Sequence, residues 1–263
     1  MMRDLDFIIC DDGCRLHYQV SGPADGAVLL LSNSLGTSLE MWGPQIARLA
    51  GTYRVVRYDQ RGHGCSDAPP GDYSLERLGC DVINLLDGLE VPRTHFCGIS
   101  MGGLTGQWLA VNVPERIDRL ILANTAAQIG QAAGWNERIE RVQSVGLPQM
   151  ADAIFERWFT TEFLAEHPGS ITRYREILTG IAASGYAGCC AAIRDADMTA
   201  ELHKIAHRTL IVAGLRDIAT SPQQASELHL AIAGSQLLEL HAAHLSNIEL
   251  PNQFTQAVID FLR

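Results

Sequence analysis

One hexapeptide in the sequence has residue types and spacing that suit nucleophilic catalysis: Gly98-Ile99-Ser100-Met101-Gly102-Gly103. It follows the apolar run Thr94–Cys97 and precedes a helical pattern, so a buried strand is expected to turn directly into a helix at Ser100. Such a turn strains the serine backbone, exposes its hydroxyl and tolerates only small residues two positions before and after it. We therefore predict that Ser100 is a nucleophile.

A serine hydroxyl needs a base beside it near neutral pH, and His244 is the best placed of the nine histidines. His244 follows the predicted strand Gln236–Leu240, and the carboxyl ends of parallel strands carry the loops that form active sites. A histidine that follows the acid also fits the chain order serine, acid, histidine. His241 is the nearest alternative, but it lies close to the strand itself.

The acid of this group is predicted to be Asp217, which follows the strand Thr209–Ala213. Its carboxylate would hold one imidazole nitrogen of the base and stabilise the imidazolium. Asp195 and Asp197 are alternatives by chain order alone, but both precede that strand. The preceding strand ends on Asn124, which leaves no carboxylate at the other usual position.

Two backbone amides are candidates to stabilise an oxyanion. The Met101 amide would lie at a helix N-terminus, where N–H groups have no partner within the helix. Leu35, in the loop Leu31–Thr37, is best placed to supply the second amide, although an ordinary strand–helix loop explains this segment equally well. The segment Tyr58–Asp67 carries charges, but buried Asp–Arg hydrogen bonding and two glycines favour a structural role for it.

Short apolar runs alternate with helical patterns along most of the chain, which indicates an α/β fold with a mostly parallel sheet covered by helices. Strands are predicted at Asp6–Cys10, Arg15–Val20, Ala27–Leu31, Tyr53–Tyr58, Thr94–Gly98, Ile117–Asn124, Thr209–Ala213 and Gln236–Leu240. Core helices are predicted at Leu75–Leu89, Gly103–Val113, Pro222–Ala231 and Gln253–Leu262.

The alternation stops after the sixth strand. Four helical patterns follow without a strand: Trp135–Val145, Met150–Phe159, Ile171–Ala183 and Ala187–Ala196. We interpret them as a helical cap inserted over the sheet edge where ligands bind. The expected organisation is therefore a core of residues 1–126 and 204–263, with a cap formed by residues 127–203.

The composition limits the classes of partner. The formal net charge is −10 and the pI is about 5.3, which argues against nucleic acid or an anionic membrane as a main partner. The seven cysteines form no zinc motif or disulfide framework, and no apolar run reaches the length of a membrane span. The N-terminal sequence has charges too early for the apolar core of a signal peptide, so a cytoplasmic location is expected.

Together these residues resemble the α/β-hydrolase superfamily and, more narrowly, its 3-oxoadipate enol-lactonases. The segments that carry the resemblance are SNSLGTSLEMW (Ser32–Trp42), YDQRGHGCSD (Tyr58–Asp67), GISMGG (Gly98–Gly103), WNERI (Trp135–Ile139), GCCAAIRDAD (Gly188–Asp197) and AAHLSNIE (Ala242–Glu249). GISMGG and YDQRGHG are common to the superfamily, whereas SNSLGTS is more selective. Most relatives have His-Gly where this chain has Asn33-Ser34, and this departure bears on the position of the second oxyanion amide.

The resemblance implies an eight-stranded α/β-hydrolase fold and hydrolysis of a small anionic lactone, with no metal or organic cofactor. The substrate carboxylate then needs a cation in a protein of charge −10. Arg138 is our choice, because it follows Trp135 by three residues and shares its helix face, so that an aromatic ring and a guanidinium would grip a flat anion. A solvated Arg138 paired with glutamates is an equal alternative, and Arg141, Arg157 and Arg175 remain open.

Three other functions remain open. A carboxylesterase or a carbon–carbon bond hydrolase would use the same core residues. A ligand receptor on the same scaffold would bind small molecules with little or no turnover. Epoxide hydrolases and haloalkane dehalogenases are disfavoured, because they resemble this fold but have aspartate where Ser100 stands.

Overall fold

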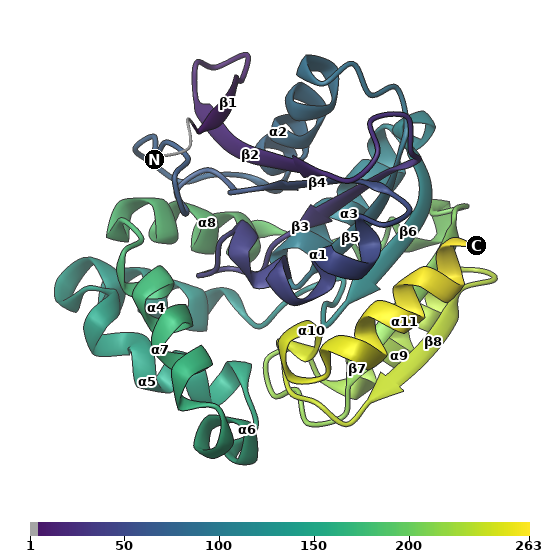
Figure 1. Ribbon diagram of the computed structural model, residues 1–263. Coiled ribbons are helices and arrows are strands. Elements are labelled where there is room, and N and C mark those ends of the chain that lie inside the picture. The colour runs from purple at the N-terminus through teal and green to yellow at the C-terminus, as the bar shows by residue number, and fades with distance from the viewer. Residues whose placement is uncertain (1–4) are drawn as a thin grey trace.

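The computed structural model describes residues 5–263 (Figure 1). Its eight strands form one sheet in the order β1-β2-β4-β3-β5-β6-β7-β8. Their bounds are β1 Asp6–Ile9, β2 Arg15–Ser21, β3 Val28–Ser32, β4 Arg54–Tyr58, β5 Thr94–Ile99, β6 Ile117–Ala123, β7 Arg208–Gly214 and β8 Gln236–Leu240. Strands β1 and β2 form an antiparallel hairpin, β2 also pairs antiparallel with β4, and all other pairs are parallel. The predicted mostly parallel eight-stranded sheet is confirmed.

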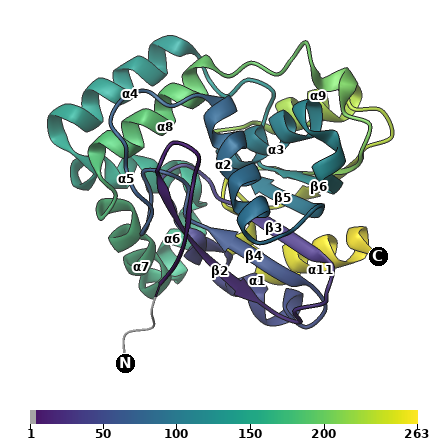
Figure 2. The same cartoon turned by 90° about the horizontal axis from the view of Figure 1, so that it is seen from above.

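Helices cover both faces of this sheet. Seen from above, α2, α3 and α9 lie on one side of the strands, and α1 and α11 lie on the other (Figure 2). These helices span α1 Gly43–Leu49, α2 Leu75–Gly88, α3 Met101–Asn112, α9 Pro222–Ala231 and α11 Pro251–Leu262, and the short α10 spans Ser246–Glu249. The central strands are buried because they are covered on both sides, which explains why β3 and β5 consist of apolar runs rather than alternating residues.

The segment between β6 and β7 contains five α-helices and no strand. They span α4 Ala132–Val145, α5 Leu147–Trp158, α6 Thr161–Glu166, α7 Pro168–Thr179 and α8 Ala183–Asp195. We call them the α4–α8 layer; both views place it to one side of the sheet and its flanking helices (Figures 1 and 2). Four of these helices match the predicted ones within a few residues, whereas α6 and α1 were not predicted, because helices of six and seven residues give little periodicity.

The described chain has one large apolar core that runs from the sheet into the α4–α8 layer. Among residues 5–263, no single helix is long and apolar enough to cross a membrane, and α7 and α8 reach that length only when counted together across a 91° bend.

Candidate active site

Ser100 lies at the sharp turn between β5 and α3. Its backbone has φ 58° and ψ −115°, a conformation that residues with a side chain rarely adopt. A Cβ on Gly98 would come within 2.2 Å of the Gly102 carbonyl oxygen, and one on Gly102 within 2.3 Å of the Ser32 carbonyl oxygen. The two glycines of the motif are therefore required by close backbone approach, as the sequence predicted.

Asp217 and His244 follow neighbouring parallel strands, β7 and β8, and meet at their carboxyl ends. Asp217 Oδ2 lies 2.8 Å from His244 Nδ1, and both side chains are buried. His241 is exposed, Asp195 pairs with Arg194 at the surface, and so neither competes with this pair. The remaining alternative, Asp197, accepts the Thr199 amide.

Protein donors surround both oxygens of Asp217. Oδ1 accepts the amides of Ala219 and Thr220 at 2.8 and 3.0 Å. Oδ2 accepts the Thr220 hydroxyl at 2.7 Å and Asn124 Nδ2 at 3.0 Å. Burial by itself raises the pKa of Asp217, but the charge and hydrogen bond of His244, with these donors, lower it to about 2. The carboxylate therefore stays ionised beside the imidazole.

The other nitrogen of His244 faces the cavity that contains Ser100. Its Nε2 lies 3.5 Å from Ser34 Oγ, and Ser34, Ser100 and His244 line the same cavity. No hydrogen bond joins Ser100 to His244 within residues 5–263; such bonds are often long before substrate binds. The sequence marks Ser34 only as a departure from a wider pattern, and no local signal predicts that its hydroxyl lies in the site.

The Leu35 and Met101 amides, predicted to bind an oxyanion, are both without an acceptor in the described chain. Met101 is the first residue of α3, and the next amide, that of Gly102, donates to the Asn33 carbonyl at 3.0 Å. Leu35 also lines the cavity of Ser100. Because buried amides normally find an acceptor, two free ones beside a strained serine indicate a site for a ligand oxygen.

Trp135 and Arg138 on α4 border the same cavity, as predicted, and Arg157 on α5 joins them. Arg138 Nε donates to the Tyr186 hydroxyl at 2.9 Å, and its guanidinium lies over the Trp135 ring at 5.5 Å. Pairing of Arg138 with glutamates, the alternative interpretation, is not observed in the described chain.

Arg157 also has no ion pair within residues 5–263. Desolvation lowers the pKa of Arg157, and the nearby charge of Arg138 lowers it further. Of the two other open candidates, Arg141 lies with both arginines at an outer pocket, whereas Arg175 pairs with Asp152. Two guanidinium groups that repel each other and have no ion pair could bind an anion between them.

Comparisons with known proteins agree with this geometry. Residues 27–251 match the family described as the alpha/beta hydrolase fold. This chain belongs to the α/β-hydrolase family. It is 45% identical to 3-oxoadipate enol-lactonase 2 of Acinetobacter baylyi over 92% of this chain and 91% of that protein. The crystal structure of the enol-lactonase from Burkholderia xenovorans superposes with a TM-score of 0.96 at 43% identity, covering 98% of this chain and 99% of the other. The predicted resemblance to the enol-lactonases of this family is therefore confirmed.

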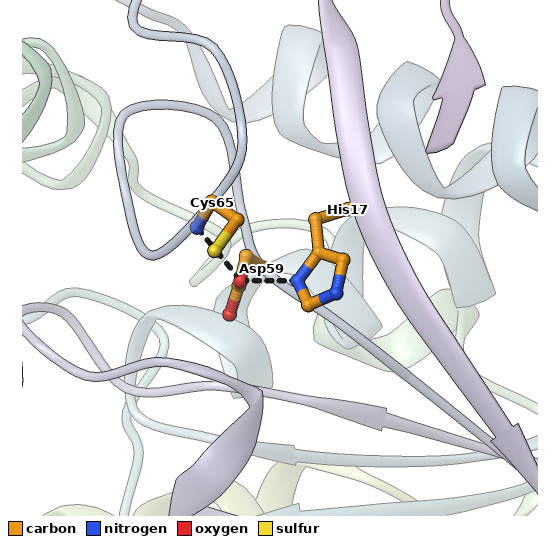
Figure 3. Close-up of side chains that lie close together, drawn as sticks. All are labelled: His17, Asp59 and Cys65. Carbon is orange, nitrogen blue, oxygen red and sulfur yellow. Dashed lines mark hydrogen bonds and ion pairs between the residues drawn. The ribbon is translucent and has the colours of Figure 1, made fainter. Parts of the chain in front are cut away.

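A second polar cluster in this α/β hydrolase joins His17, Asp59 and Cys65 (Figure 3). Asp59 Oδ2 lies 2.7 Å from His17 Nδ1 and accepts the Cys65 amide at 2.9 Å, while Oδ1 accepts the Leu39 amide at 2.7 Å. These three residues could offer ligands to a metal ion by residue type. Both oxygens of Asp59 already bind protein donors, however, so we assign the cluster to loop positioning.

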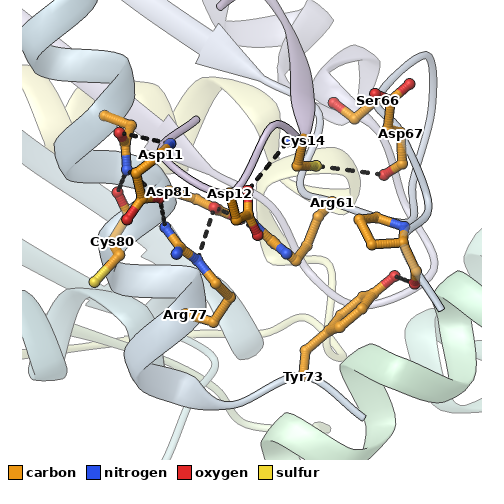
Figure 4. Close-up of polar contacts among 12 residues, drawn as sticks. Asp11, Asp12, Cys14, Arg61, Ser66, Asp67, Tyr73, Arg77, Cys80 and Asp81 are labelled. Carbon is orange, nitrogen blue, oxygen red and sulfur yellow. Dashed lines mark hydrogen bonds and ion pairs between the residues drawn. The ribbon is translucent and has the colours of Figure 1, made fainter. Parts of the chain in front are cut away.

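Besides Asp59, Arg61 also anchors the segment Tyr58–Asp67 of the α/β hydrolase. Arg61 Nε and Nη2 each donate to one oxygen of Asp81 at 2.6 Å, and Arg61 also contacts Asp12 of the β1–β2 turn (Figure 4). The segment contains a buried aspartate and a buried arginine, as expected, but these two residues do not bind each other. Asp59 binds His17, Leu39 and Cys65, and Arg61 binds Asp81 and Asp12.

Proposed function

We propose that this chain is a serine hydrolase that opens the lactone ring of 3-oxoadipate enol-lactone to give 3-oxoadipate. The observation that carries the proposal is the placing of Ser100, His244 and two arginines without acidic partners around one cavity. The identity to proteins named 3-oxoadipate enol-lactonase supports the same reaction.

In the proposed acylation step, Ser100 attacks the lactone carbonyl carbon while His244 Nε2 accepts the hydroxyl proton. Asp217 keeps the imidazole oriented and stabilises the imidazolium, as the 2.8 Å contact at Nδ1 allows. The Leu35 and Met101 amides would donate to the oxyanion, and each such donor contributes about 10²–10³ in rate.

Collapse of the tetrahedral intermediate breaks the bond between the acyl carbon and the ring oxygen. The ring oxygen leaves as an enol or enolate, takes the proton from His244 and tautomerises to the ketone. Because the substrate is a ring, this leaving group stays attached to the acyl chain on Ser100. Water activated by His244 then attacks the acyl-enzyme and releases the dicarboxylate.

The substrate carries a free carboxylate besides its lactone carbonyl. We assign its binding to Arg138 and Arg157, with the Trp135 ring against the flat lactone. The cavity that holds Ser100 shares Trp135, both arginines and Ala219 with a neighbouring pocket that Gly130 also lines. This arrangement supports a cap role for residues 127–203, because α4 and α5 supply the cationic side of the site and the sheet supplies the reacting groups.

The deciding experiment is hydrolysis of 3-oxoadipate enol-lactone, generated in situ, by the wild-type protein and Ser100→Ala side by side. We expect rapid wild-type turnover and a variant slower by about 10⁴–10⁶-fold. Slow wild-type turnover together with rapid cleavage of a simple aryl ester would favour the carboxylesterase alternative. Binding of the lactone without turnover of either compound would favour a receptor.

A further inference from the structure

His63 is a buried histidine outside the group of reacting residues, and both of its ring nitrogens contact backbone near the site. Its Nε2 lies 2.9 Å from the Gly36 amide nitrogen, and its Nδ1 lies 3.3 Å from the Arg61 carbonyl oxygen. An amide can only donate and a carbonyl can only accept, so Nε2 must be unprotonated and Nδ1 must carry the proton. Burial lowers the pKa of His63 to about 4, which keeps this neutral form.

The amide that His63 holds belongs to the turn that carries Leu35. The Ser34 carbonyl accepts the Thr37 amide at 3.3 Å and the Thr37 hydroxyl at 2.7 Å, and Gly36 has φ +84°. The N–H and C=O of one trans peptide point in opposite directions. The Leu35 amide, in the same peptide as the Ser34 carbonyl, therefore points away from Thr37, and it has no acceptor in the described chain.

The peptides on both sides of Leu35 are thus fixed from different places. Thr37 holds the Ser34–Leu35 peptide from within the turn, whereas His63 holds the Leu35–Gly36 peptide from outside it. Loss of the His63 acceptor would leave the Gly36 amide buried without a partner and free the second peptide to rotate.

The support behind His63 is itself rigid. Arg61, whose carbonyl binds the ring, is fixed by its two hydrogen bonds to the buried Asp81 (Figure 4). Two further contacts hold the chain on either side of the turn: Gln60 Nε2 donates to the Asn33 carbonyl at 3.1 Å, and Asp59 accepts the Leu39 amide.

We propose that His63 is a positioning residue that keeps the Leu35 amide aimed at the oxyanion formed on Ser100. This inference rests on the proposed hydrolase function, because it needs an oxyanion at that amide. The YDQRGHG segment, whose sequence predicts only a structural role, then also has a catalytic consequence. His63 acts through Gly36 and does not touch the substrate.

The test compares His63→Leu, which removes the acceptor, with His63→Gln, whose Oε1 can reach the Gly36 amide in place of Nε2. Four quantities are measured for each variant. The first two are kcat and KM, for 4-nitrophenyl acetate and for the enol-lactone. The third is the Ki of phenylboronic acid, which forms a tetrahedral adduct on serine with an oxygen at the oxyanion position, and the fourth is the Ki of adipate, a ground-state probe that needs no oxyanion.

We expect His63→Leu to lower kcat by about 10–100-fold, somewhat less than full loss of one oxyanion donor. The Ki of the boronic acid should rise by the same factor, while KM and the adipate Ki change by less than about threefold. His63→Gln should recover most of both losses. If His63→Leu does not fold, His63→Asn replaces it, because its shorter side chain does not bring an acceptor to the Nε2 position.

The control is His95→Leu, a buried histidine at the start of β5, which should lower the melting temperature without changing boronate affinity. A folded His63→Leu with wild-type kcat and boronate affinity would overturn the proposal, as would a His63→Gln no better than His63→Leu. Failure of the proposed function looks different: the wild type would then cleave the aryl ester or bind boronate but leave the enol-lactone intact, and the His63 comparison would still hold.

Discussion

Both carboxylate oxygens of Asp217 accept hydrogen bonds, and each of these hydrogen bonds comes from a donor on a neighbouring residue. The amides of Ala219 and Thr220, the Thr220 hydroxyl and Asn124 all point donors at it, together with His244 Nδ1. A carboxylate is the side chain that accepts on both oxygens without placing a hydrogen against any donor. The identity of this residue is therefore set by its neighbours as much as by the imidazole.

We predict that Asp217→Asn lowers kcat by about 10⁴-fold, because the amide NH₂ must face a donor or force the other tautomer on His244. Urea unfolding should also show a lower stability, by about 1–3 kcal/mol, since one buried donor loses its acceptor. Steady-state kinetics on the enol-lactone measures the first effect. A variant with more than a tenth of wild-type kcat would contradict the assigned acid.

A second residue-scale prediction concerns His63 and pH. The pKa of this histidine is lowered from 6.5 to about 4 by burial, so between these values the unfolded chain binds a proton that the folded chain does not. Its contribution to stability is complete above pH 6.5 and is lost as pH falls toward 4, by roughly 3 kcal/mol at most.

Replacing His63 by Gln removes that proton uptake. Urea unfolding at pH 7 and pH 4.5 should therefore show a smaller fall in stability for His63→Gln than for the wild type, by about 2 kcal/mol. Equal falls in the two proteins would mean that the folded chain protonates His63 readily.

At the scale of elements, the α4–α5 pair brings Arg138 and Arg157 to one cavity from two different helices. Neither residue has an acidic partner in residues 5–263, although seventeen side-chain ion pairs, histidine contacts included, are present elsewhere in that part of the chain. Other arginines, such as Arg48 and Arg119, also have no ion pair in the described chain. Arg138 and Arg157 differ from them because both line the cavity that contains Ser100. An anionic substrate in that cavity would supply the missing charge.

We predict that Arg138→Gln and Arg157→Gln each raise KM for the enol-lactone by about 10–100-fold, the equivalent of one charge-assisted hydrogen bond. Turnover at saturation should change far less, because the carboxylate binds alike in the ground and transition states. Arg175→Gln, which removes an arginine already paired with Asp152, is the matched control and should leave KM unchanged. Unchanged KM in both test variants would place the carboxylate elsewhere.

At the scale of the whole molecule, one of the contacts between the α4–α8 layer and the core joins two glycines. A Cβ on Gly185 of α8 would lie 2.4 Å from Gly62 Cα, and Gly62, in the loop after β4, has φ +78°. The backbones of the two parts therefore touch without side chains between them. Gly62 directly precedes His63 in the chain, so this contact bears on the site as well as on docking of the layer.

We predict that Gly185→Ala lowers the free energy of unfolding by about 1–3 kcal/mol, because α8 must move away from the core to admit the methyl group. Gly134→Ala on α4 is the matched control: nothing lies within 4 Å of its added Cβ, so it should stabilise the protein by up to about 1 kcal/mol. Denaturant unfolding of both variants measures the difference. A neutral Gly185→Ala would show that the two parts separate at little cost.

Much of the protein follows from local sequence. Local patterns predicted all eight strands: short alternating runs indicated β1 and β2, and apolar runs indicated central strands such as β3 and β5, which are covered on both faces. The order of Ser100, Asp217 and His244 after particular strands predicted their meeting, because the carboxyl ends of parallel strands share one edge of the sheet. Short helices such as α1 and α6 escaped prediction, because less than two turns of helix gives no clear period.

Tertiary structure alone decided the remaining partners of the site. Sequence spacing offered Arg138 and left Arg157 open, and only the packing of α5 beside α4 brings the second arginine to the same cavity. The Ser34 hydroxyl near His244 and the His63 ring at the Gly36 amide join residues 210 and 27 positions apart. Such contacts depend on how loops from separate strands come together in space, and a pattern within one segment carries no information about that distance.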